Sequence, residues 1–561
     1  AIYEKSLASD HPEIATSLNN LAGLFVAQGK YSEAEPLLRR SLAIKEKTFG
    51  PDHPEVALAL NNLADLLVVT GKYSAAEPVF QRALDIEEKV FGQIHPNVAR
   101  AINNLGQLFN TQGNYARAEP LLRRSLSIHE QVFGADHLLV AVSLGNLAGV
   151  LTEKGNYSAA EPLYRRSLAI KERALGTDHP DIATSLNNLA LLLTAQGNLQ
   201  GAEPLQRRAL AITEKAHGPN HPDVASDLNN LAMLFNAQGR YSDAKPLLNR
   251  SLAIKEKAFG PDHPDVGLAL NNLAMLLVQQ GQYAAVEPLL YRALAIEEKS
   301  LGPDHPNVAK SLNNIAQLLG RQGNITASQP LLRRALAIKE KALGPDHPDV
   351  AISLNNLAAA FTEQGVYISA EPLFRRALAI REKSLGLNHP DVAQSLNNIA
   401  MLLDKQGKYI AAEPLYLRSL AIKEKAFGPD HPDVALVLNN LALLLVQQDM
   451  YGAAERLLRR ALAIREKSLG ADHPDVASSY SNFAGLLSAS RNYVNAMPFL
   501  ARSLAIESTF LIRELPLLPD QARSAQLRQL GNGWQRPFGL IEQYFPAATL
   551  ALETRLNRHG L

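Results

Sequence analysis

A single stretch recurs along this 561-residue chain at a fixed spacing of 42 residues. Residues 50–62 give one clear copy, GPDHPEVALALNN, and its histidine stands at positions 11, 53, 95, 137, 179, 221, 263, 305, 347, 389, 431 and 473. A fixed period between about 20 and 50 residues is typical of solenoids, propellers and other repeat arrays. We therefore expect one elongated body of twelve units, and not the several domains that this length would otherwise suggest.

The composition excludes several classes of partner and site. Lys and Arg total 56 against 55 Asp and Glu, so the chain lacks the basic excess that nucleic acid or an anionic membrane attracts. The absence of cysteine removes disulfides, thiolate metal sites and a cysteine nucleophile. No window approaches 18 uninterrupted apolar residues, so we expect no membrane span.

Each unit contains two amphipathic helical patterns, which we name helix A and helix B. In the first unit Leu18, Leu21, Ala22 and Phe25 show the i, i+3, i+4, i+7 spacing of helix A. Helix B starts near Tyr31 and runs to about residue 49. One pair alone would leave apolar faces in water, so neighbouring pairs must stack, and a constant rotation per unit curls the stack into a superhelix with a concave side.

Six positions of the unit carry a family resemblance: Ala22, Phe25, Gly29, Tyr31, Ala34 and Leu38. Their order resembles the tetratricopeptide repeat. The 42-residue length and the runs LNNLA and AIKEK…GPDHP are similar to the kinesin light chain type. The resemblance covers roughly 500 residues. It implies an all-α, right-handed superhelical solenoid of about twelve helix-turn-helix repeats that binds other proteins and is not an enzyme.

We expect three segments along the chain. Residues 1–9 align with the B helix one period later and should be part of a preceding repeat, while residues 10–511 form the array. Residues 512–561 should form a helical connector, which resembles the segment joining such arrays to a caspase-like CHAT domain in bacterial proteins. That resemblance implies an alternative function, the sensor arm of a CHAT protease whose catalytic domain lies beyond this chain.

The recurring histidine invites a metal-site interpretation. Packed helices lie about 8–10 Å apart, however, and histidines one repeat apart are too distant to share an ion at bonds of about 2 Å. We expect instead that each histidine caps helix A. No GxSxG or GxxxxGK[ST] loop occurs. We therefore predict no catalytic residue, no metal site and no cofactor.

The asparagine pair of each LNN run is the main candidate for binding. At 100° per residue both side chains leave the apolar stripe of helix A. Their carboxamides can bond the backbone of an extended peptide, or form a ladder with neighbouring groups. We favour the ladder for the second Asn and the groove for the first. The first-position candidates are Asn19, Asn61, Asn103, Asn187, Asn229, Asn271, Asn313, Asn355, Asn397 and Asn439.

Two further registers of helix A vary between units. The register of residue 16 includes Arg100 and Lys310, and that of residue 23 includes Met233, Met275 and Met401. Mixed apolar and polar groups on the Asn19 side suit recognition of an extended segment, and Met adapts its shape easily. Drift of ordinary surface residues explains the variation equally well. The mixed charges of helix B predict a solvated outer face.

The sequence thus predicts a scaffold or adaptor that binds peptide segments or partner proteins in a concave groove, in the cytoplasm. Apolar residues of the first unit, Ala1, Ile2 and Leu7, favour self-association through an open repeat face as a further partner choice. Because the chain begins inside a repeat, the sequence does not show whether a targeting signal precedes it.

Overall fold

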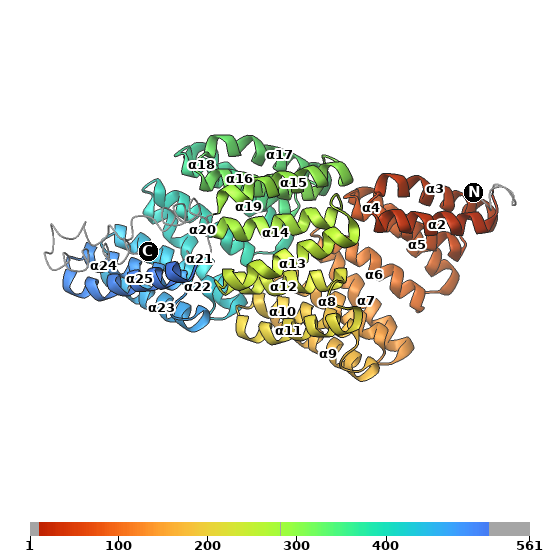
Figure 1. Cartoon of the computed structure of the whole chain (residues 1–561), viewed down its shortest axis with the longest axis horizontal. Coiled ribbons are helices and arrows are strands. Elements are labelled where there is room, and N and C mark those ends of the chain that lie inside the picture. Colours follow the sequence, from red (N-terminus) through yellow and green to blue (C-terminus); the bar gives the residue numbers. More distant parts are fainter. Residues whose placement is uncertain (1–9, 281, 515–561) are drawn as a thin grey trace.

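The computed structural model describes residues 10–280 and 282–514, where it contains twenty-four helices and no strand. Figure 1 shows them as consecutive pairs. The A helices are α2 (Pro12–Ala27), α4 (Pro54–Val69), α6 (Pro96–Thr111), α8 (Leu138–Glu153), α10 (Pro180–Ala195), α12 (Pro222–Ala237), α14 (Pro264–Gln279), α16 (Pro306–Arg321), α18 (Pro348–Glu363), α20 (Pro390–Lys405), α22 (Pro432–Gln447) and α24 (Pro474–Ala489).

The B helices are α3 (Tyr31–Phe49), α5 (Tyr73–Phe91), α7 (Tyr115–Phe133), α9 (Tyr157–Leu175), α11 (Leu199–His217), α13 (Tyr241–Phe259), α15 (Tyr283–Leu301), α17 (Ile325–Leu343), α19 (Tyr367–Leu385), α21 (Tyr409–Phe427), α23 (Tyr451–Leu469) and α25 (Tyr493–Glu514). Each B helix packs against its own A helix, and each except α25, the last described helix, also packs against the next A helix. The predicted all-α array of twelve helix pairs is confirmed. The predicted end segments 1–9 and 515–561 lie outside the described residues.

The recurring histidine begins each A helix. Its Nδ1 accepts a hydrogen bond from the backbone N–H two residues later, as in His53 from Glu55 at 3.2 Å and His347 from Asp349 at 3.0 Å. The bond satisfies one of the helix's free N-terminal donors. The same cap occurs in all twelve A helices, including α8, where Leu138 replaces the proline. The predicted capping role is confirmed.

The core runs between neighbouring repeats. Leu63 and Leu66 of α4 are each 2% exposed because α2 and α3 cover them. The counterparts in the first repeat, Leu21 and Leu24, are 41% and 53% exposed. Stacking of a neighbour, and not the helix pair alone, therefore buries this side of helix A. Self-association through the first repeat stays a prediction, because Ala1, Ile2 and Leu7 lie outside the described residues.

The A helices form the inner side of the superhelix. Neighbouring A helices touch one another along the array, as α4 touches α6 and α16 touches α18, more closely than neighbouring B helices do. A stack curves toward the side on which its units lie closer together. In Figure 1 the chain passes through α8–α11 low in the view and returns through α15–α18 above them.

Successive turns of this superhelix touch. The A–B turn of each of the first six repeats lies against the start of the A helix six repeats later. His305 Nε2 lies 3.1 Å from the Val69 carbonyl oxygen, and His389 Nε2 lies 2.8 Å from that of Glu153. Equivalent bonds join His347 to Thr111 and His431 to Ala195. We name this row of contacts the inter-turn seam.

Glycine permits the close approach at the seam. A Cβ on Gly113 would lie 2.5 Å from Pro348 Cδ, and one on Gly71 would lie 2.9 Å from Pro306 Cδ. In the second turn the same turn position is open, since a Cβ on Gly365 would meet nothing within 4 Å. Repeats 11 and 12 place Asp449 and Arg491 there, both at φ 59. Non-glycine residues therefore occur where no further turn packs on them.

The seam fixes the protonation state of its histidines. Nδ1 accepts the helix-capping bond, so Nε2 carries the proton and donates it to the carbonyl of the earlier turn. Burial lowers the pKa of the four histidines that bond across the seam, His305, His347, His389 and His431. The first-turn counterparts His53 and His137 are exposed. The two turns thus use the same residue differently.

Acidification should open the seam. Because the folded pKa of these histidines lies below the ordinary value, their stabilising effect is complete above about pH 6.5 and is lost as pH falls through the folded pKa. Protonation of Nδ1 would also remove the cap bond. We expect the maximum dimension from small-angle X-ray scattering to grow between pH 7.5 and pH 5 with helicity retained. An unchanged scattering profile would contradict this.

Gly113→Ala should separate the turns, and Gly365→Ala supplies the matched control. Both glycines have positive φ, 64° and 76°, so each substitution costs about 1–2 kcal/mol of backbone strain. The Gly113 variant alone meets Pro348 across the seam. We expect scattering to show a longer particle for Gly113→Ala and a wild-type particle for Gly365→Ala. Equal dimensions in the two variants would show that the seam does not set the shape.

Candidate peptide-binding groove

The asparagine pairs form a hydrogen-bonded ladder along the inner surface. In a typical rung, Nδ2 of the second Asn donates to Oδ1 of the first Asn in the preceding repeat. Asn272 bonds Asn229 at 2.7 Å, and Asn314 bonds Asn271 at 2.9 Å. The other rungs are Asn62–Asn19, Asn104–Asn61, Asn146–Asn103, Asn440–Asn397 and Asn482–Asn439.

The ladder gives both Asn positions a part in joining repeats. Asn271 is 2% exposed and also donates to Ser311 Oγ at 2.7 Å. Buried first-position residues are Asn61, Asn187, Asn271, Asn355, Asn397 and Asn439, while Asn19, Asn103, Asn229 and Asn313 are partly exposed. A peptide that used Asn61, Asn271, Asn397 or Asn439 would have to displace a rung. The sequence did not predict that the two positions bond each other.

The ladder is interrupted in two places. Gly145 removes one rung, and at the next Asn187 Oδ1 is buried without a hydrogen bond, although Asn187 Nδ2 donates to Asp227 at 2.5 Å. In the second place Asn313 Oδ1 and both polar atoms of the Asn355 side chain are likewise buried without a hydrogen bond. Buried polar atoms are rarely left unpaired, so this second interruption needs a physical explanation.

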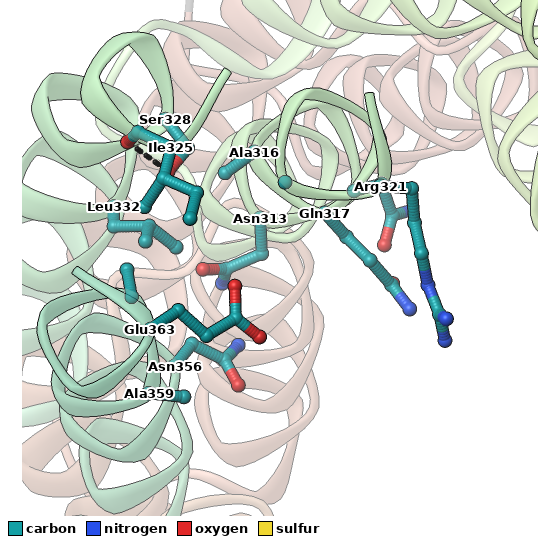
Figure 2. Close-up of a pocket in the computed structure, with 13 residues that line it drawn as sticks. Asn313, Ala316, Gln317, Arg321, Ile325, Ser328, Leu332, Asn356, Ala359 and Glu363 are labelled. Carbon is teal, nitrogen blue, oxygen red and sulfur yellow. Dashed lines mark hydrogen bonds between the residues drawn. The ribbon is translucent and has the colours of Figure 1, made fainter. Parts of the chain in front are cut away.

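A cavity of about 460 Å³ lies at the second interruption, between α16, α17 and α18. Figure 2 shows the side chains of Asn313, Asn356 and Glu363 converging on it, with Leu332 and Ile325 on its apolar wall. Gln317, at the variable register of residue 23, lines the cavity too. The cavity therefore opens on the predicted groove.

The residues of the two variable registers lie on the same surface but differ in exposure and in their contacts. Met233 and Met401 are 43% and 40% exposed, whereas Met275 is partly buried. Arg100 NH2 lies 3.8 Å from the buried Glu87, so part of its role is to offset that charge. Lys310 is exposed beside Glu297 and lowers the pKa of that carboxyl against the larger effect of burial. Exposed apolar residues of the two registers are Leu58, Val142, Leu191, Leu268, Ile352 and Leu443.

A second polar register was missed from the sequence. One buried B-helix position faces the acidic residue at the start of the next A helix, as Lys423 Nζ lies 2.9 Å from Asp433. Where this position is acidic, at Glu87 and Glu297, the residue ten places later is asparagine and not aspartate. The two positions thus change charge together between repeats, which is a signal that the sequence contains.

Within the described part of the chain, no group of three His, Cys, Asp or Glu side chains is placed to hold a metal ion. None of the helices there combines the length and apolar character needed to cross a bilayer. The inner surface therefore offers side-chain amides, a few charges and exposed apolar groups. These groups suit reversible binding of a polypeptide.

Comparison with known families agrees with this geometry. Tetratricopeptide repeats match residues 1–47, 13–89, 97–173, 140–215, 181–257, 246–296, 265–341, 311–383, 349–425, 391–467 and 433–507, with a second tetratricopeptide match at 61–132. The chain belongs to the tetratricopeptide repeat family. A search of curated proteins finds no match. The matched ranges end at residue 507, so the CHAT-connector resemblance of residues 512–561 stays a prediction.

Solved structures similar to this tetratricopeptide array include kinesin-light-chain-like proteins. One is a protein of Podosopora anserina described as a kinesin light chain with nearly identical TPR-like repeats, at 27% identity over 37% of this chain and 98% of that one, with a TM-score of 0.32. BtubC (BKLC) of P. vanneervenii matches at 22% identity, over 42% and 92%, with a TM-score of 0.34. A Rap protein complexed with competence and sporulation factor matches at 16% identity, over 67% and 99%, with a TM-score of 0.45.

The outer face of the tetratricopeptide array carries ion pairs between consecutive B helices. Arg208 NH2 lies 2.7 Å from Glu172 Oε1, and Arg418 NH2 lies 2.7 Å from Glu382 Oε1, each 36 residues apart. Such partly exposed pairs stabilise by at most about 1 kcal/mol each. The mixed charge that we expected to be simply solvated is therefore arranged as links between repeats.

The ladder predicts unequal effects for two asparagines. Asn271→Ala would leave the polar groups of Ser311 and Asn314 with one partner fewer, a loss of about 1–3 kcal/mol. Asn313→Ala removes an oxygen that already lacks a partner. We expect hydrogen exchange in α14 and α16 to accelerate at least tenfold for Asn271→Ala, and exchange in α16 and α18 to stay near wild type for Asn313→Ala. Equal exchange in both variants would contradict the ladder.

Proposed function

We propose that this tetratricopeptide array is a binding scaffold without chemistry of its own, which holds an extended segment of a protein partner along the inner surface of its A helices. The observation that supports this most is the row of exposed, varied side chains at the registers of residues 16 and 23. Apolar members such as Leu191, Met233 and Met401 are exposed on helices whose other apolar residues are buried.

An extended segment fits this surface better than a globular domain does. Neighbouring A helices repeat the two registers at a regular spacing, so the contact points form a strip along the array. A peptide strand meets one contact point per repeat without needing a wide opening.

Charged substitutions on the inner strip should abolish binding. The test uses a random-peptide display library and three full-length proteins: wild type, the inner variant Leu191→Glu/Met233→Glu/Met401→Glu, and the outer variant Ile368→Glu/Ile410→Glu. Ile368 and Ile410 are 91% and 90% exposed on B helices, so they control for the added charge. We expect peptides selected on wild type to bind the inner variant at least about tenfold more weakly.

The outer variant should bind the same peptides as wild type does, measured by fluorescence anisotropy. Equal loss in both variants would place the binding surface outside the inner strip. Full binding by the inner variant would contradict the proposed function directly. Circular dichroism of each protein distinguishes loss of binding from loss of fold.

A further inference from the structure

The cavity between α16, α17 and α18 lies where repeats 8 and 9 carry small residues. At the position of Ala360, ten of the other eleven repeats have leucine and the remaining one has valine, Val150. Gly320 stands where the corresponding residue of repeat 7 is Val278, and Ala359 where that of repeat 10 is Met401. Each replacement removes side-chain volume from the same place. The small residues of repeats 8 and 9 thus account for the cavity.

The lost volume coincides with lost hydrogen bonds. Asn356 should donate to Asn313 if this rung followed the others, but Asn313 Oδ1 is buried without a partner. Figure 2 shows Asn313 and Asn356 on either side of the Glu363 carboxylate, with no hydrogen bond drawn between them. An unpaired buried acceptor is costly unless a donor reaches it. The cavity beside the missing rung has room for a side chain from outside the chain.

The acceptors of the cavity outnumber its cations. Glu363 forms no ion pair within the described residues, and Figure 2 shows its carboxylate between the side-chain amides of Asn313 and Asn356. Arg321 lines the edge, but Figure 2 shows its side chain turned away from Asn313 and Glu363. A carboxylate without an ion-pair partner favours a ligand that carries hydrogen-bond donors and positive charge.

The remaining wall is apolar. Leu332, Ile325, Ala316 and Ala360 supply methyl and methylene surface next to the Glu363 carboxylate. Lysine and arginine combine a long hydrocarbon stem with a donor-rich cationic end, and they bury the stem while the end reaches polar groups. A small anion or a wholly apolar side chain would satisfy only one part of this lining.

We infer that this cavity is a subsite for one basic side chain, lysine or arginine, of the extended segment held by the groove. The stem lies against Leu332 and Ala360, and the cationic end donates to the Glu363 carboxylate. This inference rests on the proposed function, because the side chain belongs to the same bound segment. It adds a position at which the partner's sequence is read by charge.

The test uses peptides selected on the full-length wild-type chain. We expect them to share one lysine or arginine, and replacement of that residue by norleucine, which keeps a hydrocarbon stem, to weaken binding about tenfold. On Glu363→Gln the same replacement should weaken binding less than about twofold. Exchanging lysine for arginine in the peptide then decides which of the two side chains the subsite prefers.

Two variants provide the controls. Ala360→Leu restores the residue that most repeats carry, so it should fold, fill the cavity and weaken every peptide that depends on the basic residue. Glu153→Gln removes a carboxylate at the same register of α8 and should keep the full norleucine effect. Fluorescence anisotropy supplies all the affinities.

The outcomes separate the two proposals. Selected peptides without a shared basic residue, or a norleucine effect that is equal on wild type and Glu363→Gln, would overturn the subsite and leave groove binding intact. Undiminished binding by Ala360→Leu would overturn it as well. Failure of wild type to retain any peptide would overturn the groove and the subsite together.

Discussion

The fold depends on the need of each helix pair for a neighbour. The A helix has apolar residues on more than one side, and its own B helix covers only part of them. Leu63 and Leu66 are buried because the preceding repeat covers them, while Leu21 and Leu24 of α2 are exposed. Each repeat is therefore stabilised mainly by the interfaces on its two sides, as expected for a one-dimensional array.

A constant repeat length turns this local packing into a global contact. Each unit adds nearly the same rotation, so a repeat lies beside the repeat six units earlier. The residues that bond across the seam are therefore always 236 positions apart in the chain. A substitution in one repeat alters one contact of the seam and leaves the others unchanged, so the seam tolerates single substitutions. The close approach nevertheless demands glycine in the first turn, as at Gly113.

The inner surface shows how a repeat protein makes one position different from the rest. The ladder of asparagines joins most repeats in the same way, and interruptions mark the places that differ. At Asn187 the chain gives the side-chain nitrogen a partner, Asp227, and leaves the side-chain oxygen without one. At Asn313 it supplies a cavity and a carboxylate from Glu363 instead. Because most repeats are joined in the same way, a repeat with different contacts is easily recognised. A repeat that differs from the others is what allows one position of a partner to be bound specifically.

Much of the fold could be predicted from the sequence because the same pattern occurs in many copies, and features shared by the copies stand out from the variation of single residues. Twelve copies of one pattern determined the helix pairs, the capping histidine and the all-α solenoid, since the apolar spacing and the cap are properties of residues close in the chain. The compensating changes at Glu87 and Glu297 were readable in the same way, although we predicted only a solvated charged face for helix B.

Only the tertiary structure determines which residues at equivalent positions of the repeats have different roles. His53 and His305 have the same neighbours in sequence, yet only His305 donates to the earlier turn. The difference arises from the superhelical rotation, a small angle summed over six units, which no local pattern specifies. The Asn ladder and the cavity at Ala360 have the same origin, because both depend on the distance between helices of different repeats and not on any one helix.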